Sequence, residues 1–128
     1  MNTAARRTMH IGQLAERTGL SLRTIRHYDD VGILPPAART DGGFRVYTES
    51  DVERLLLIRR MKPLGFTLEE MQGLLDVTDG LDTETDPARV LELRAALESF
   101  RTSAAERREK LVETLARADE FLERLGRL

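Results

Sequence analysis

The sequence contains no cysteine among its 128 residues. Disulfide bonds, thiolate-bound metals and iron–sulfur clusters are therefore excluded, and a small secreted fold held by disulfides is disfavoured. No run of about 18 apolar residues is present, so we expect no membrane span and no membrane partner. The N-terminal segment MNTAARRTMH lacks the apolar centre that a signal peptide needs. We therefore expect a cytoplasmic protein.

Residues that carry covalent or metal-assisted catalysis are also scarce. The chain has no thiol nucleophile, no glycine-rich phosphate loop and no set of metal ligands at motif spacing. Its two histidines, His10 and His27, have no carboxylate at the spacing of a catalytic pair. We expect neither an enzyme nor a bound cofactor.

Aromatic residues make up 5% of the chain and charged residues 33%, so the core is small and oligomerisation would help to stabilise it. The net charge of −2 is unevenly distributed. Residues 1–66 hold 11 Lys and Arg against 7 Asp and Glu, a net of +4; residues 67–128 hold 9 against 15, a net of −6. The basic half can bind phosphate while the acidic half points away.

The segment 11–28, IGQLAERTGLSLRTIRHY, is typical of a helix-turn-helix. Gly19 permits a left-handed turn, the small Ala15 lets two helices approach, and Ser21 can cap the second helix. The face of that helix expected to be buried carries Leu22, Ile25 and Tyr28. The opposite face carries Arg23, Thr24, Arg26 and His27. This face suits a groove lined with phosphates and base acceptors, and a merely solvated charged face is the alternative.

The next segment, GILPPAARTDGGFRVY, predicts a short β-hairpin. Pro35 and Pro36 stop the helix, and the Asp-Gly-Gly sequence turns the chain before a strand resumes. Arg39 and Arg45 flank the turn, where both can reach backbone phosphates or a neighbouring minor groove. The alternative is a surface hairpin with ordinary charges.

Two further helices are expected after the hairpin. Thr48 can cap the first, with Asp51 in its first turn. Its buried stripe is predicted to be Val52, Leu55, Leu56, Ile58 and Met61. The second starts at a capping box of Thr67 and Glu70. Its predicted buried residues are Leu68, Met71, Leu74 and Leu75.

Helical periodicity is lost over residues 77–86, which we expect to form an acidic hinge. A hard cation could be held there by Asp79, Asp82, Glu84 and Asp86, although solvated linkers have the same composition. Asp86 and Pro87 then predict the start of one helix of roughly forty residues, about 60 Å long. Its seam is Val90, Leu93, Leu97, Phe100, Ala104, Arg107, Leu111, Thr114, Ala118, Phe121, Leu125 and Leu128. A domain of this size cannot cover such a seam, so we expect a homodimer.

Three separated motifs resemble the MerR family of bacterial transcription regulators. They are TIRHYDDVGIL (24–34), ARTDGGFRVYTESDVERL (38–55) and LGFTLEEMQGLL (64–75). In order and spacing they match the family's recognition helix, first wing, third helix and second helix pair. His27 stands where the family usually has an aromatic residue. The resemblance extends from Met9 to about Asp76.

This resemblance implies a mainly α fold with three parts. Residues 1–76 would form a winged helix-turn-helix DNA-binding domain with a small β wing, 77–86 a hinge, and 87–128 an antiparallel coiled-coil dimerisation helix. We expect Arg23 to contact a base edge. The other expected DNA-binding residues, chiefly phosphate contacts, are Ser21, Thr24, Arg26, His27, Tyr28, Arg39, Arg45, Tyr47 and Lys62.

The resemblance also implies a mechanism. The family's dimers bind a pseudo-palindromic spacer between two promoter elements and bend and untwist it, so RNA polymerase is a partner only indirectly, through the DNA. The two half-sites would lie in successive major grooves, about 34 Å apart or a small multiple of this. The protein would then work at the nucleoid.

The sequence leaves the effector open. A small molecule between the dimer helix and the partner's DNA-binding part, and a repressor with no ligand, are both compatible with it. We expect no C-terminal drug-sensing domain after Leu128. Two other functions stay open: an architectural DNA-bending protein of the excisionase type, and a coiled-coil adaptor that does not bind DNA.

Overall fold

The structure is a computed structural model that describes residues 7–35 and 38–128. Two sequence predictions fall partly outside the described residues: the N-terminal segment without a signal peptide, and the helix stop at Pro36. No helix in the described ranges is both long and apolar enough to cross a membrane. The described residues form two compact units, which divide between Met61 and Lys62.

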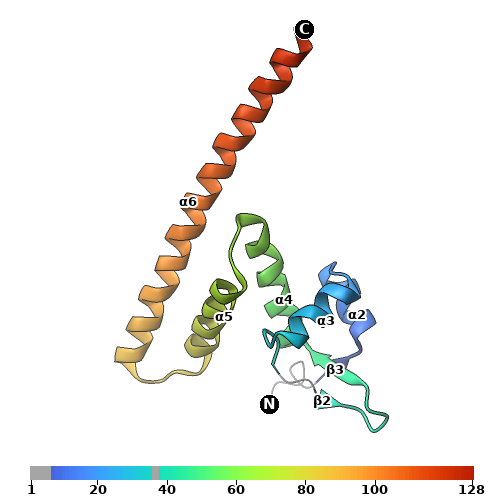
Figure 1. Ribbon diagram of the computed structural model, residues 1–128. Coiled ribbons are helices and arrows are strands. Elements are labelled where there is room, and N and C mark those ends of the chain that lie inside the picture. The colour runs from blue at the N-terminus through green and yellow to red at the C-terminus, as the bar shows by residue number, and fades with distance from the viewer. Residues whose placement is uncertain (1–6, 36–37) are drawn as a thin grey trace. The chain divides into compact units, whose positions relative to one another are not determined.

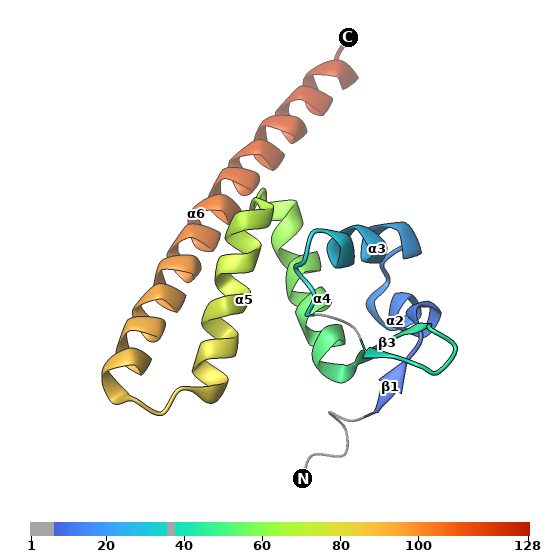
Figure 2. The same cartoon turned by 60° about the horizontal axis from the view of Figure 1, so that its bottom comes forward.

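The first unit combines short helices with a small antiparallel sheet (Figures 1 and 2). Its elements are β1 (Thr8–Met9), α2 (Ile11–Thr18), α3 (Leu22–Asp30), β2 (Ala38–Arg39), β3 (Arg45–Thr48) and α4 (Glu49–Met61). β3 lies between the other two strands, where Met9 pairs with Tyr47 and Arg39 pairs with Arg45. The β2–β3 hairpin is the wing that the turn residues predicted.

The turn between α2 and α3 confirms the predicted helix-turn-helix. Gly19 ends α2 in the left-handed region, with φ 71°, and its N–H donates to the Ala15 carbonyl at 2.8 Å. Ser21 caps α3, because its hydroxyl accepts the N–H of Thr24 at 3.1 Å. The side chains of Leu14 and Ile25 are fully buried between the elements of this unit.

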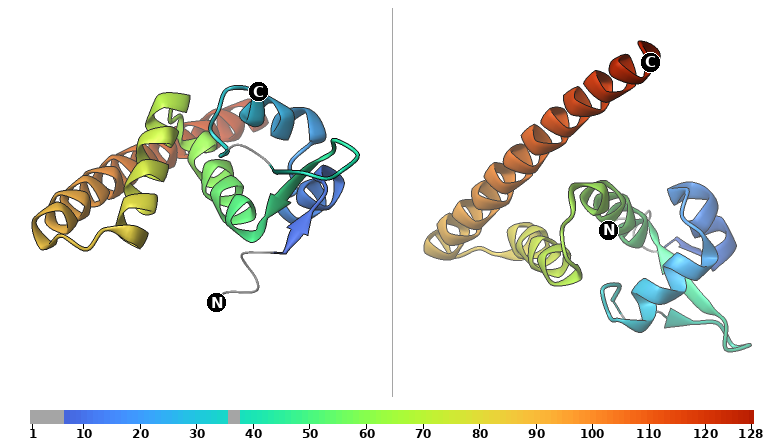
Figure 3. Two further views of the ribbon diagram at one scale, coloured as in Figure 1. Left: turned by 90° about the horizontal axis from the view of Figure 1, so that it is seen from below. Right: turned by 45° about the horizontal axis from the view of Figure 1, so that its top comes forward.

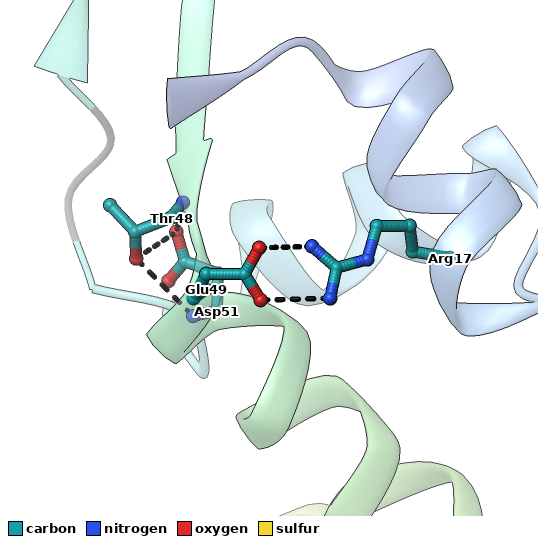
Figure 4. A network of polar contacts seen from close by, with 4 residues as sticks. All are labelled: Arg17, Thr48, Glu49 and Asp51. Atoms are coloured by element: carbon teal, nitrogen blue, oxygen red, sulfur yellow. Dashed lines mark hydrogen bonds and ion pairs between the residues drawn. The ribbon is translucent and has the colours of Figure 1, made fainter. Parts of the chain in front are cut away.

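The start of α4 is fixed by two sets of polar contacts (Figure 4). The Asp51 carboxylate accepts the N–H of Thr48 at 2.9 Å, and the Thr48 hydroxyl accepts the N–H of Asp51 at 3.3 Å. The predicted cap is thus reciprocal. Glu49 pairs with Arg17 of α2, with Nη2 2.8 Å from Oε2. Arg17 therefore ties α2 to α4.

The predicted stripe of α4 is buried at Val52, Leu55, Ile58 and Met61 and half-buried at Leu56. The prediction for α3 is wrong at one position, because Leu22 is 40% exposed. Leu22 is the first residue of α3, one turn before Ile25, where the buried face of the helix begins.

The second unit is a helical hairpin preceded by a short 3₁₀ turn (Figures 1 and 3). Its elements are η1 (Lys62–Leu64), α5 (Leu68–Thr83) and α6 (Pro87–Gly126). Thr67 and Glu70 form the predicted capping box, and Asp86 caps the long helix through the N–H of Ala88 at 3.2 Å. α6 has 40 residues, as the sequence predicted.

The segment expected to be a hinge is mostly helical. α5 continues to Thr83, and only residues 84–86 lie outside helices. The acidic composition hid an apolar face: Val77 is buried and Leu81 half-buried, at the spacing set by Leu74. A second expectation for α5 is wrong at its first residue, Leu68, which is 37% exposed.

Two glycines bring α5 and α6 close together. A Cβ at Gly80 would lie 3.0 Å from Cδ1 of Leu93, and one at Gly73 would lie 3.4 Å from Cζ of Phe100. Each pair of positions is seven residues apart on its helix, so the same packing recurs after two turns of an antiparallel hairpin. The glycines leave the space that these large side chains fill.

The first half of the α6 seam is therefore covered by the chain itself. Leu93 is buried, and the half-buried seam residues in this part are Val90, Leu97, Phe100 and Ala104. We expected that a second copy would have to cover the whole seam. The structure corrects this for the first half, because α5 is long enough to reach along it.

Replacing Gly80 by Val should destabilise the second unit by about 1–3 kcal/mol, because the added methyl groups meet Leu93 in a filled space. The free energy of unfolding in urea, measured by circular dichroism, checks this. In a Leu93→Ala background the same substitution should cost much less, because the clash is removed. Equal costs in both backgrounds would contradict the packing described.

Candidate nucleic-acid interface

The outward face of α3 carries cations without partners. Arg23 and Arg26 are exposed, and neither forms a hydrogen bond or ion pair with any described residue. His27 is also exposed, with its ring centroid 5.8 Å from that of Tyr28. The helix therefore presents two guanidinium groups and an imidazole to solvent, as predicted from the helical spacing.

Ser21 and Thr24 mainly serve the start of α3. The Ser21 hydroxyl donates to Oγ1 of Thr24 at 2.9 Å while it accepts the Thr24 N–H. Ser21 is exposed and Thr24 half-buried. Their oxygens keep further lone pairs, and the cap fixes the first turn of α3 on which Arg23 lies.

The wing hairpin holds one of its arginines folded back. The turn is closed by the N–H of Gly43 on the Thr40 carbonyl at 2.8 Å, with φ 82° at Gly43. Nη1 of Arg39 donates to the Gly43 carbonyl at 2.8 Å. A phosphate contact from Arg39 would use its remaining N–H groups or exchange this neutral acceptor for a charged one.

Asp29 joins the end of α3 to the wing. Its carboxylate pairs with Arg45 and accepts the Tyr47 hydroxyl at 2.9 Å. The Asp29 side chain is only 7% exposed, whereas that of Arg45 is 40% exposed. The hydrogen bond to Asp29 raises the pKa of Arg45. Sequence analysis missed Asp29, because the partners lie 16 and 18 residues away and no local pattern links them.

The two tyrosines among the predicted DNA-binding residues lie in the core of the first unit. Tyr28 is 5% exposed and Tyr47 is 2% exposed. Burial, then the hydrogen bond to Asp29, raises the pKa of Tyr47 to about 12. Its hydroxyl already donates to Asp29, so its place in the structure is that of a support for β3 and α3.

A hollow of about 630 Å³ lies between α3, the wing and the start of α2. It is lined by His10, Ile11, Arg26, Asp30, Phe44, Arg45 and Tyr47. Phe44 is 68% exposed and meets the His10 ring edge-on, with centroids 6.4 Å apart. We predicted no role for His10 or Phe44. Phe44 follows the turn directly, a position that could have drawn attention to it.

Two further cations, Arg59 and Lys62, have surroundings that differ from those of the arginines on α3. Nη1 of Arg59 donates to the Thr18 carbonyl at 2.9 Å, at the C-terminus of α2, so it supports the helix-turn-helix. Lys62 is exposed on the first residue of η1 in the second unit. Its ammonium group forms no hydrogen bond or ion pair with any residue in the described ranges, and such a group binds phosphate as a point charge.

The second half of α6 is an apolar stripe without cover. Every residue from 108 to 128 is exposed. The large apolar side chains among them are Leu111, Val112, Leu115, Phe121, Leu122, Leu125 and Leu128. On a single chain this surface faces water, which is costly for apolar groups and typical of an interaction surface.

The acidic residues considered for a cation do not gather. Across the described ranges, no three or more His, Asp or Glu side chains are placed to hold a metal ion. Asp79 and Asp82 lie on the last turns of α5, whereas Asp86 caps α6.

Two family profiles match the chain. The one described as MerR HTH family regulatory protein matches residues 9–77, and the one described as MerR, DNA binding matches residues 52–128. Each covers more than half of the chain. Their overlap lies over α4, η1 and most of α5.

Individual regulatory proteins are also similar to this chain, in sequence or in structure. The mercuric resistance operon regulatory protein of Bacillus cereus is 46% identical over 69 residues, 54% of this chain and 52% of that protein. The HTH-type transcriptional regulator YfmP of Bacillus subtilis is 40% identical over 106 residues, 82% of this chain and 69% of that protein. The crystal structure of HiNmlR, a MerR family regulator lacking the sensor domain and bound to promoter DNA, matches with a TM-score of 0.68 and 25% identity over 91% of this chain and 82% of that one. The chain spans about half the length of curated relatives such as the mercuric regulator.

The Tyr47 contact predicts a dependence of stability on pH. Because folding raises its pKa from 10.0 to about 12, its contribution is complete below pH 10 and is lost as the pH rises towards 12. We expect the free energy of unfolding to fall by about 2 kcal/mol over this window. Urea unfolding across pH 9–12 measures it. Tyr28→Phe should keep this fall and Tyr47→Phe should remove it; an unchanged fall in Tyr47→Phe would refute the assignment.

Proposed function

The chain belongs to the MerR family of transcriptional regulators, and we propose that it acts as a homodimer on promoter DNA. The observation that carries the proposal is the outward face of α3, where Arg23 and Arg26 have no partner among the described residues. A short helix that follows a tight turn and presents guanidinium groups is suited to the major groove. The family's members are regulators of transcription, in agreement with this use.

The residues divide into base and phosphate contacts. Arg23, near the start of α3, is proposed to contact a base edge, since the N-terminal residues of a recognition helix enter the groove. Arg26 and His27, one turn further along, are proposed to bind phosphate, together with the exposed Lys62. Arg39 and Arg45 join them from the wing. Arg45 reaches DNA with its charge already balanced by Asp29, so it orients the wing more than it adds attraction.

The dimer is proposed to form through the exposed half of α6. Residues of the predicted seam that remain uncovered there are Leu111, Thr114, Ala118, Phe121, Leu125 and Leu128. An antiparallel pair of α6 helices would bury these side chains and join two DNA-binding parts in one dimer. We propose that the DNA-binding part of the chain extends to about residue 76 and that the dimer helix starts at residue 87.

Binding of such a dimer would distort the DNA between its half-sites. We propose a pseudo-palindromic promoter spacer as the target, bent and untwisted so that RNA polymerase can engage both promoter elements. Specificity then includes the deformability of the central base steps. The site of action is the bacterial nucleoid in the cytoplasm. The sequence has no cysteine, so an effector of this chain would be held by other groups.

A binding titration tests the proposal and its base contact. With a fluorescent duplex from the chain's own upstream promoter, Arg23→Ala should lose about 1–3 kcal/mol and relax discrimination at one base pair. Arg26→Ala should weaken binding to promoter and random duplexes alike and reduce the salt slope by about 0.9. Equal losses from both variants on both duplexes would contradict the assigned roles. No binding at low salt by the wild-type chain would favour the adaptor alternative.

The dimer makes its own prediction. Phe121→Glu should raise the dimer dissociation constant by about a hundredfold or more, because two carboxylates would be buried at a twofold interface. Sedimentation velocity over a range of concentrations measures it. Leu91→Glu is the matched control: Leu91 is 71% exposed but lies outside the seam, so this variant should stay dimeric. A wild-type chain that is monomeric at micromolar concentration would disprove the proposed assembly.

A further inference from the structure

Arg107 is one of two polar residues in the α6 seam, and its contacts explain why an arginine stands there. Its guanidinium carbon lies 4.0 Å from the ring centroid of Phe66. Nη1 donates to the Leu64 carbonyl at 3.3 Å, and Nη2 donates to the Glu70 carboxylate at 2.9 Å. Nε donates to the Ser103 hydroxyl at 3.2 Å. A single side chain of α6 therefore contacts a ring and a carbonyl of the segment that leads into α5, and a carboxylate in the first turn of α5.

These contacts hold the turn that follows Lys62. The turn is closed by the N–H of Gly65 on the Lys62 carbonyl at 3.0 Å, with φ 81° at Gly65. Nη1 of Arg107 lies 3.7 Å from where a Cβ on Gly65 would be, and Phe66 is only 7% exposed. One guanidinium thus joins both Leu64 and Phe66, at the end of this turn, to α6.

Arg107 also marks the end of the packed part of α6. It is half-buried, and every residue after it is exposed. The last residue of α6 that packs against the rest of its own unit is therefore the residue that contacts the turn. Arg107 therefore connects the proposed dimer helix to the turn that carries Lys62, the proposed phosphate contact.

Resting on the proposed function, we propose that Arg107 is a positioning residue for the DNA contact of Lys62. By holding residues 64–66 on α6, it sets where Lys62 lies along the helix that joins the two copies. The spacing between the two Lys62 side chains of a dimer is then fixed before DNA is met. A preorganised pair of cations binds two phosphates with less loss of conformational entropy than a mobile pair.

The chemistry requires a guanidinium. Its planar fork can stack on the Phe66 ring while separate N–H groups reach Leu64 and Glu70. A lysine keeps the charge and can pair with Glu70, but it cannot make all three contacts at once. Glu70 suits this partner, since the N–H of Thr67 and the charge of Arg107 both lower its pKa.

The test is a titration of the full chain against the promoter duplex at several salt concentrations. The variants are Arg107→Met, Arg107→Lys, Lys62→Ala and the double variant Arg107→Met with Lys62→Ala. Arg108→Met is the matched control, because Arg108 is its neighbour on α6, is 70% exposed and, among the described residues, pairs only with the adjacent Glu109. Sedimentation and thermal unfolding report the assembly and stability of each variant.

We expect Lys62→Ala to weaken binding about three- to tenfold and to reduce the salt slope by about 0.9. Arg107→Met should do the same while the chain stays folded and dimeric. The double variant should bind within about twofold of either single variant, because both remove one contact. Arg107→Lys should fall between wild type and Arg107→Met, and Arg108→Met should bind within about twofold of wild type.

A merely structural role would give a different pattern. Arg107→Met would then lower the melting temperature but leave the salt slope of the folded dimer unchanged, or its loss would multiply with that of Lys62→Ala. Either result overturns the inference. If Arg107→Met fails to fold, Arg107→Lys and Phe66→Leu are judged by the same criteria. Absence of DNA binding by the wild-type chain would overturn the proposed function, whereas binding that is equal in Arg107→Met and Arg108→Met would overturn only the role of Arg107.

Discussion

The close contact between α5 and the first half of α6 decides what the second unit can offer to a partner. Gly73 and Gly80 let α6 approach, so Phe100 and Leu93 are satisfied within the chain. The apolar side chains beyond Arg107 have no such cover. The surface proposed to bind a second copy is therefore the part of α6 that this packing leaves exposed. The total apolar content of α6, taken alone, overstates the apolar surface that is open to a partner.

Several arginines of the first unit form hydrogen bonds or ion pairs within the protein, whereas those on the outward face of α3 form none with any described residue. Arg17 is held by Glu49, and Arg45 by Asp29, while Arg59 donates to a helix C-terminus. These contacts fix α2, the wing and α4 in place. What remains free on α3 is a small number of cations at a defined spacing. Arg17 and Arg45 are balanced by carboxylates, so the positive excess of this half of the chain lies on other cations, Arg23 and Arg26 among them.

Local patterns in the sequence were sufficient to predict where α3, α4 and α5 start. The caps at Ser21, Thr48 and Thr67 involve residues three positions apart, so their spacing is visible in the sequence, and the structure has all three. Contacts between distant residues were not accessible in this way. Asp29 meets Arg45 only because α3 and β3 pack together. The extension of α5 to Thr83 was missed because its polar face is acidic and its apolar face depends on α6.

The uncovered stripe at the end of α6 has a consequence for how the protein responds to its own abundance. If the last five turns of α6 pair with a second copy, as proposed, the dimer is the main species only above a threshold number of molecules per cell. At chain concentrations below the dissociation constant of this dimer, the amount of dimer grows with the square of the amount of chain synthesised. Occupancy of an operator would then rise more steeply than the amount of chain, because a twofold increase in synthesis would raise the amount of dimer about fourfold.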